Sequence, residues 1–462
     1  MSQMSSASVK FPDSVPGVDY PKQLQLKYLQ VIFRHGERAP VKERLGSAGI
    51  PKDWKLCNNA RRFFAQIKGE KEWSVLGFER KVESPVDTSL AAPTSDNSPS
   101  GVCIHGELTD FGRVTTRTLG EYLRERYVKQ LKFLPDELNN YADVYMRATP
   151  MVRALESLEH VFSGLYPESK RKMGLPVIFT RNWSDENLLP NENNCPRLVQ
   201  LYEEFAERAA KLYDPLLAGR ASEMMSQFMN GQPVRVVSSH PRLSGLLDTI
   251  NAAIGSHVDF NPNLRDEQWL RDAETAVVEE WFGGYKVSKL MRQLGAGSLL
   301  NDLSMRMENF VVAEKNGSPY HRLALYGAHD VTIAAILASL DAFDYRWPPF
   351  TSHLEMELFE DTSSKSDSQN QSGDNKTTDL KLFSDESTDA SNSAIVAASN
   401  SARDMSDWYV RITYNSTPVV MGACRGQGYK GNDTICPLSI FKDTVRALKP
   451  VEYHTMCKPV KK

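Results

Sequence analysis

The 462-residue sequence lacks several features that would place it in a class at once. It has no basic excess, because 55 Lys and Arg stand against 58 Asp and Glu, for a net charge of −3. A protein that binds nucleic acid or an anionic membrane surface is expected to carry such an excess, so neither class is favoured. No apolar run is long enough to span a membrane, and no transmembrane segment is predicted.

Cysteine is also sparse, and its spacing argues against a common metal site. No two of the six cysteines form a C-x-x-C pair, and a zinc cluster is therefore not predicted. An even number of cysteines in a long chain fits disulfides and buried thiols equally well. The six residues are Cys57, Cys103, Cys195, Cys424, Cys436 and Cys457.

The N-terminal residues lack the basic segment and apolar stretch of a secretory signal. Residues 1–23 are expected to be a flexible N-terminus. The cytoplasm is the expected compartment, with a mitochondrial or secreted location as the alternatives.

Three segments repeat one pattern, in which an apolar strand-like run ends in polar residues and a helical pattern follows. The runs end at Arg34-His35, at Arg147-Ala148-Thr149 and at His329-Asp330. Strands that alternate with helices predict an α/β fold, with a central mixed β-sheet flanked by helices. Ligands of such sheets bind outside the carboxyl ends of the strands, so these polar residues are expected to meet in one place. Thr149 and Pro150 predict the start of the second helix.

The stretch between the second and third units is mainly helical in pattern. We expect an inserted helical subdomain over residues 183–310, and an α/β domain formed by residues 24–182 and 311–462. Residues 361–407 are rich in Ser, Asp, Asn, Lys and Thr and cannot bury enough apolar surface to fold. They are expected to be a disordered insertion within a hairpin, because both flanking segments alternate as strands do. Residues 84–100 are expected to form a mobile surface loop.

The three strand ends hold the residue types that phosphoryl transfer from an ester requires. A planar guanidinium matches the geometry of phosphate oxygens, and a neutral imidazole can attack phosphorus. A carboxylic acid can protonate the leaving oxygen. We therefore expect His35 as the nucleophile, Asp330 as the acid, and Arg34, Arg38, Arg147 and His329 as the groups that bind the phosphate. Asp330 can instead be the N-cap of the helix that follows it.

Other residues near these motifs have simpler explanations. Arg153 is expected to pair with a carboxylate rather than to bind a ligand, and Trp269 and Trp347 are expected in the core. His240 is a candidate to line the pocket. Gly36 is expected to let the backbone approach the bound phosphate, where a Cβ would obstruct it.

These motifs resemble those of a known family. Residues 34–40, RHGERAP, resemble the RHGxRxP signature of the histidine acid phosphatases, and His329-Asp330 resembles their distal HD pair. Arg147-Ala148-Thr149 is similar to the arginine–Ser/Thr element of the family, and residues 106–112 are similar to its G-x-L-T-x-x-G segment. The similarity runs from about Leu24 to Cys457. Stretches such as residues 326–350 are most similar to the lysophosphatidic acid phosphatase branch.

The resemblance implies a phosphoglycerate mutase-like fold and an acid phosphatase that acts on phosphate monoesters without a metal or another cofactor. It implies a phosphohistidine on His35 and proton donation by Asp330. The substrate is expected to be a small-molecule or lipid monoester such as lysophosphatidic acid. An acyl chain would be received by part of an apolar helical set, Leu243, Leu246, Leu247 and Ile250. The alternatives are a phytase-like or broad-specificity acid phosphatase and a non-catalytic phosphate-ester-binding protein. The sequence leaves the oligomeric state open.

Overall fold

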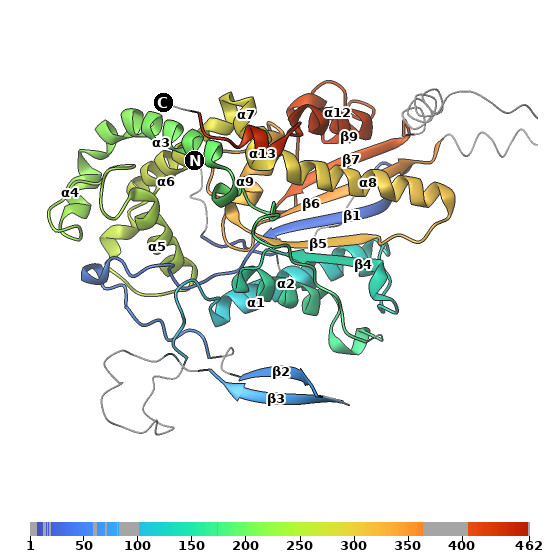
Figure 1. The fold of residues 1–462 in the computed structure, drawn as a ribbon, viewed down its shortest axis with the longest axis horizontal. Helices are drawn as coiled ribbons and strands as arrows, with labels where there is room; N and C mark the ends of the chain where they lie inside the picture. Colours follow the sequence, from blue (N-terminus) through green and yellow to red (C-terminus); the bar gives the residue numbers. More distant parts are fainter. Residues whose placement is uncertain are drawn as a thin grey trace, which may run out of the picture.

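A mixed β-sheet forms the centre of the molecule (Figure 1). The computed structural model describes residues 7–12, 15, 17, 20–58, 62–69, 72–80, 82, 101–172, 174–363 and 405–460. The strands lie in the order β4-β5-β1-β6-β7-β8, and β9 pairs with β7. β4, β5 and β1 are parallel, whereas β6 is antiparallel to both β1 and β7. This arrangement confirms the predicted α/β class.

The bounds of the elements are as follows. The strands of the central sheet are β1 (Leu24–Arg34), β4 (Val144–Ala148), β5 (Leu323–Ala328), β6 (His353–Asp361), β7 (Trp408–Tyr414), β8 (Thr417–Val419) and β9 (Ile435–Pro437). The helices are α1 (Asp110–Leu123), α2 (Val152–Leu165), α3 (Pro196–Leu217), α4 (Arg220–Ser226), α5 (Leu243–Gly255), α6 (Glu267–Val287), α7 (Lys289–Arg292), α8 (Ser298–Asn316), α9 (Asp330–Ser339), α12 (Leu438–Leu448) and α13 (Tyr453–Met456).

Helices cover both faces of the sheet because its central strand is apolar on both sides. In β1, Leu29, Val31 and Phe33 are fully buried in the core shared with α1 and α2. Tyr28 and Ile32 point to the opposite face and are buried in the core shared with α8, α9 and α12. A strand buried on both faces reads as a continuous apolar run rather than as an alternating one. Figure 1 shows α1 and α2 on one side of the sheet and α8 and α12 on the other.

A helical layer formed by α3, α4, α5 and α6 lies beside the carboxyl ends of the parallel strands (Figure 1). It has a core of its own, and that core includes Leu243, Leu246, Leu247 and Ile250, each at most 4% exposed. The expectation that part of this set receives an acyl chain was therefore wrong. α5 packs its apolar side against α6 instead, which leaves these side chains no free surface. α8 starts within the stretch expected to be inserted, but it packs on β1.

The two strands that flank the long polar stretch pair as their alternation predicts. β6 and β7 form an antiparallel ladder from Leu354–Tyr414 to Glu360–Trp408. The polar stretch itself, from residue 364 to residue 404, lies outside the described residues, as does the predicted loop at 84–100. Near the N-terminus, Phe11 stacks on His353, and Val9 donates a backbone hydrogen bond to Phe350.

Two further features were not predicted. Strands β2 (Arg62–Lys68) and β3 (Trp73–Glu79) pair antiparallel and project from the rest of the molecule in Figure 1. The run at residues 233–237, which has the composition of a strand, forms no strand. Among the described residues, no helix has both the length and the apolar character needed to cross a membrane.

All six cysteines are paired. The disulfides join Cys57 to Cys103, Cys195 to Cys457 and Cys424 to Cys436. The structure thus resolves the choice between disulfides and free thiols in favour of disulfides.

Candidate active site

The carboxyl ends of β1 and β5 bring the two histidines of the motifs together. Arg34 and Ala328, the last residues of these strands, pair in register, and the backbone N–H of His35 donates to the Ala328 carbonyl at 3.0 Å. The rings of His35 and His329 consequently lie edge to face, with their centroids 5.5 Å apart. The sheet edge thus joins two motifs that are about three hundred residues apart in the chain.

His35 is held as a neutral imidazole. Its Nδ1 lies 2.9 Å from the carbonyl oxygen of Gly36, which can only accept, so Nδ1 carries the proton and Nε2 keeps its lone pair. Burial lowers the pKa of His35 well below its ordinary value, and the positive charges of Arg153, Arg34 and Arg38 lower it further. A neutral ring with a free Nε2 is the form that can act as a nucleophile.

Asp330 lies against Arg34 and Trp347. Its Oδ2 atom is 2.8 Å from Nη2 of Arg34 and accepts a hydrogen bond of 3.2 Å from the Trp347 indole N–H. Burial raises the pKa of this carboxyl, but the charges of Arg34 and Arg38 outweigh burial, so the pKa is lowered overall. Asp330 is therefore ionised near neutral pH in this structure. Asp330 is the first residue of α9, whose N-cap is His329.

Arg34, the last residue of β1, and Arg38, in the loop that follows, are both buried and both fixed by residues distant in the chain. The guanidinium of Arg34 lies 4.0 Å from the centre of the Phe350 ring and donates to the Pro348 carbonyl at 2.6 Å. Arg38 pairs with Asp248 of α5, at 2.6 Å between Nη2 and Oδ1. The helical layer thus supplies an acidic partner to the motif, and no sequence pattern indicated that contact.

Arg147 in β4 and Arg153 in α2 both differ from what the sequence predicted. Arg147 points to the side of the sheet where it pairs with the buried Glu186 and donates to the Asn187 side-chain oxygen at 2.9 Å. The structure does not bring it together with His35. Arg153, in the first turn of α2, is the arginine whose charge acts most strongly on both His35 and His329.

Arg153 also lacks the carboxylate partner that was expected for it. No ion pair among the described residues includes it, and its buried Nε has no hydrogen-bond partner. Burial, together with the neighbouring charge of Arg38, lowers the pKa of Arg153 to about 10. One sequence signal could have identified Arg153. The N-terminal end of the helix dipole is positive and repels a cation in the first turn, so an arginine at that position indicates that an anion binds nearby.

His329 is held in place by Thr149. Its Nε2 lies 2.9 Å from the Thr149 hydroxyl, and burial lowers the pKa of His329 to about 3, assisted by Arg153. This contact occupies the side chain that was expected to cap α2. The helix begins instead at Val152, with Met151 as its N-cap, so the predicted start at Thr149-Pro150 was wrong.

Close backbone packing explains Gly36 better than the approach of phosphate does. A Cβ at Gly36 would lie 2.3 Å from the carbonyl oxygen of Gly112 in α1, and a Cβ at Gly112 would lie 2.1 Å from the carbonyl oxygen of Glu37. Only two glycines allow the motif loop and the start of α1 to approach so closely. The N-cap of α1 is Thr109, whose side-chain oxygen accepts a hydrogen bond from the backbone N–H of Gly112.

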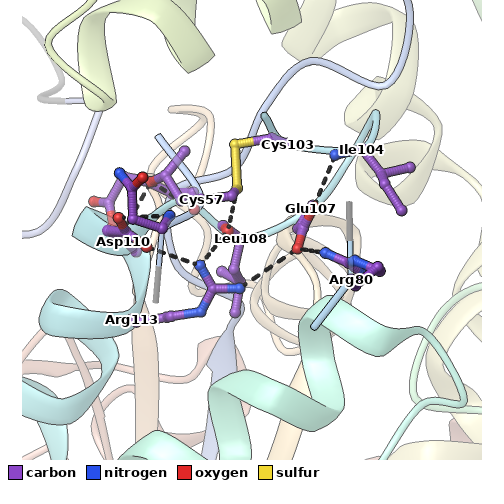
Figure 2. The surroundings of a disulfide bond; sticks show 12 residues. Cys57, Arg80, Cys103, Ile104, Glu107, Leu108, Asp110 and Arg113 are labelled. Carbon is purple, nitrogen blue, oxygen red and sulfur yellow. Dashed lines mark hydrogen bonds and ion pairs between the residues drawn. A yellow bond between two sulfur atoms is a disulfide. The ribbon is translucent and has the colours of Figure 1, made fainter. Parts of the chain in front are cut away.

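Segment 101–113 braces the motif loop from outside, and a disulfide anchors this segment (Figure 2). Ala39 donates its backbone N–H to Glu107, and Thr109 donates its own to Glu37, both at 2.9 Å. Figure 2 shows Glu107 between Arg80 and Arg113, and its carboxylate also accepts from the Ile104 backbone at 2.7 Å. The loop that carries Arg38 is thereby fixed before any ligand binds.

We call the resulting set the catalytic cluster: Arg34, His35, Arg38, Arg153, His329 and Asp330. It combines a neutral imidazole, three cations that can hold a phosphate dianion, and a carboxyl beside one of the cations. Within the described ranges no group of His, Cys, Asp and Glu is arranged to hold a metal ion. His240, the other candidate for lining the site, is an exposed loop residue, and Trp347 contacts Asp330 rather than lying in the core alone.

The fold and this cluster define a phosphoryl-transfer enzyme of the histidine phosphatase type. The model of the histidine phosphatase superfamily (branch 2) matches residues 25–383, and the chain belongs to that family. The chain is 28% identical over 440 residues to lysophosphatidic acid phosphatase type 6 from Bos taurus and 26% identical over 441 residues to the protein of that name from Homo sapiens. Both alignments cover 94% of this chain and 86% of the relative.

A solved structure shares the fold. Hafnia alvei phytase in complex with tartrate superposes with a TM-score of 0.56 at 15% sequence identity, covering 95% of this chain and all of the phytase. At that identity the similarity establishes the architecture alone.

Proposed function

We propose that the protein is an acid phosphatase that transfers the phosphoryl group of a monoester to His35 and then to water. The observation that carries the proposal is the state of His35, a buried neutral imidazole whose Nδ1 proton is fixed on the Gly36 carbonyl. Arg34, Arg38 and Arg153 surround it, so a phosphate dianion bound by them places its phosphorus near Nε2. The transition state spreads negative charge over three oxygens, which these fixed cations stabilise.

Asp330 protonates the leaving oxygen in this proposal. In the free enzyme its pKa is lowered by Arg34 and Arg38. A bound phosphate dianion offsets the charge of both arginines, so binding raises the pKa of Asp330 toward protonation. The proton is thus held at the carboxyl when the ester oxygen departs, and the resulting carboxylate can take a proton from the water that hydrolyses the phosphohistidine.

The test of this mechanism is the intermediate. Turnover of a radiolabelled monoester followed by alkaline quenching should leave a base-stable, acid-labile phosphate on His35. His35→Ala should abolish both the label and turnover while the far-UV circular dichroism stays unchanged. Near-normal turnover in a folded His35→Ala protein would exclude the mechanism.

We further propose a monoester with an uncharged or lipid-like leaving group, such as lysophosphatidic acid. The names of the relatives from Bos taurus and Homo sapiens support this choice, because the similarity extends over 94% of the chain. The charge of the cluster also supports it. Beyond Arg34, Arg38 and Arg153, the nearby Asp248 and Asp330 are acidic, which disfavours a substrate that carries many phosphates.

The measurement is kcat/KM on lysophosphatidate and on inositol hexakisphosphate, with glycerol phosphate as the small reference. We expect lysophosphatidate to be the best of the three. A higher value for inositol hexakisphosphate would reject the lipid substrate and leave the phosphatase mechanism in place.

The compartment follows as a separate proposal. Three disulfides that pair every cysteine favour an oxidising compartment, which corresponds to the secreted alternative rather than to the cytoplasm. Fractionation of cells that express the full chain, with alkylation of free thiols before lysis, checks this. A fully reduced protein in the cytosolic fraction would support the cytoplasmic expectation instead.

A further inference from the structure

A pocket lies in the helical layer, between α3, α6 and the segment that leads into α5. Its volume is about 290 Å³. Its lining residues are Glu192, Val199, Tyr202, Glu203, Ala206, Glu207, Val237, Arg242, Glu280 and Trp281. We call it the α3–α6 pocket.

The charge and the walls of this pocket differ from those of the catalytic cluster. Four glutamates face one arginine, which gives the lining a formal surplus of three negative charges. The rest of the wall is aliphatic or aromatic, and the rings of Tyr202 and Trp281 lie 5.9 Å apart. Carboxylates on an apolar and aromatic wall suit a cation with an organic body, because the ring faces attract a positive charge as well.

One of the glutamates is buried with part of its bonding capacity unused. Glu280 is only 3% exposed, and one of its oxygens, Oε1, is held by Arg242. The other oxygen, Oε2, has no hydrogen-bond partner among the described residues, and neither has the buried indole N–H of Trp281. A buried carboxylate oxygen without a donor is costly, and a ligand that brings an N–H⁺ donor would remove that cost.

We propose that the α3–α6 pocket binds an organic primary ammonium ion. The ammonium group donates to Glu280 Oε2, and its apolar body lies against Tyr202, Val199 and Trp281. A primary ammonium fits better than a quaternary one, because only the former supplies the missing hydrogen-bond donor. A metal ion fits poorly, since among the residues that the structure describes no group of acidic side chains has the arrangement to ligate one.

The protonation of Glu280 agrees with this assignment. Burial raises the pKa of Glu280 to about 7, against the opposing effect of Arg242. With Arg242 alone this carboxyl is therefore only partly ionised near neutral pH, and a second cation in the pocket would favour its charged form.

The pocket is separate from the catalytic cluster but close to it. Trp281, which lines the pocket, packs edge to face on Trp347 with ring centres 6.3 Å apart. Trp347 in turn donates its indole N–H to Asp330. Two indoles therefore stand between the proposed ammonium site and the catalytic acid.

The experiment is isothermal titration of the full chain with 2-phenylethylammonium, with 2-phenylethanol as the uncharged analogue. We expect one site for the ammonium compound, no measurable binding of the alcohol, and no displacement by inorganic phosphate at matched ionic strength. Glu280→Gln should weaken binding roughly tenfold or more, because it removes a charged hydrogen-bond acceptor. Glu279→Gln is the matched control, since it makes the same change in the adjacent residue of α6, which does not line the pocket, and affinity should stay within about twofold.

Other outcomes overturn the proposal. Equal affinity in Glu280→Gln and in the parent, equal binding of the alcohol, or displacement by phosphate would each do so. If Glu280→Gln does not fold, Glu192→Gln carries the test, because it changes a half-buried lining residue and keeps the Arg242–Glu280 pair. Unchanged affinity in a folded Glu192→Gln protein would then reject the charge-based assignment.

Discussion

The catalytic cluster and the α3–α6 pocket are two concentrations of charge of opposite sign, and two indoles lie between them. Arginines surround His35 in the first, whereas glutamates dominate the lining of the second. Both contain buried charged groups with unused bonding capacity: Nε of Arg34, Arg38 and Arg153 in the cluster and Oε2 of Glu280 in the pocket. Arg147 also has a buried Nε without a hydrogen-bond partner, but its guanidinium pairs with the buried Glu186 and donates to Asn187. Arg153, unlike Arg147, forms no ion pair among the described residues, so an anionic ligand would supply the missing partner.

The largest expected effect concerns Asp330 of the catalytic cluster, which Trp347 and Trp281 connect to the α3–α6 pocket. Asp330→Asn should lower kcat on glycerol phosphate by roughly 10³-fold, because a poor alkoxide leaving group needs the proton. An activated aryl phosphate, whose anion leaves unaided, should lose less than about tenfold. The comparison of the two rates is the measurement. Equal losses on both substrates would mean that Asp330 only positions Arg34.

The next effect separates Arg147 of β4 from Arg153 of α2. Arg153→Ala should lower kcat/KM roughly 10²- to 10³-fold, because it removes a preorganised cation from the phosphate site. Arg147→Ala should instead cost about 3–5 kcal/mol of folding free energy by leaving Glu186 buried and unpaired. The folded Arg147→Ala protein should keep kcat/KM close to that of the parent.

The control for this pair is Arg147→Met combined with Glu186→Gln, which removes both charges and should recover most of the lost stability. Urea unfolding and steady-state kinetics on all the variants check the contrast. If Arg147→Ala proves to be the catalytically defective protein, the assignment of Arg153 to the phosphate site is wrong.

The smallest effect is a dependence of stability on pH that belongs to the α3–α6 pocket. The pKa of Glu280 in the folded protein is about 7, above its ordinary value of 4.5, so the folded state holds a proton that the unfolded state has released. This contribution is fully present below pH 4.5 and is lost as pH rises through 7. Its size is up to about 3 kcal/mol.

Urea unfolding between pH 4.5 and pH 7.5 measures this effect. The free energy of unfolding of Glu280→Gln should fall less with rising pH than that of the parent, while Glu279→Gln should follow the parent. Parallel pH profiles of Glu280→Gln and the parent would show that Glu280 titrates normally.

The sequence predicted the sheet and most of the cluster because both depend on short-range patterns. The apolar run of β1 and the polar residues after it stand together in the chain, and the same holds for β5 and His329-Asp330. Because ligands of α/β sheets bind outside the carboxyl ends of the strands, the polar residues at the ends of β1 and β5 are expected side by side. His35, Arg34, Arg38, His329 and Asp330 do meet in the structure.

The features that the sequence did not predict depend on the direction in which side chains point and on contacts between residues that are far apart in the chain. Arg147 and Arg153 are six positions apart, and the choice between them depends on which face of β4 and which turn of α2 points to His35. Trp347 reaches Asp330, and Asp248 reaches Arg38, through packing of the helical layer. Neither contact has a local sequence signal. The acyl-chain expectation failed because helical spacing shows an apolar face but not whether another helix covers it.

The disulfide between Cys195 and Cys457 gives the chain the covalent topology of a large ring with a tail. His35 and Arg153 stand on the tail, and His329 and Asp330 stand within the ring. A single proteolytic cut anywhere between residues 196 and 456 would therefore yield two peptides that stay in one molecule until a reductant is added. Such a nicked protein would migrate at the full-length mass on a non-reducing gel, with both parts of the catalytic cluster still joined.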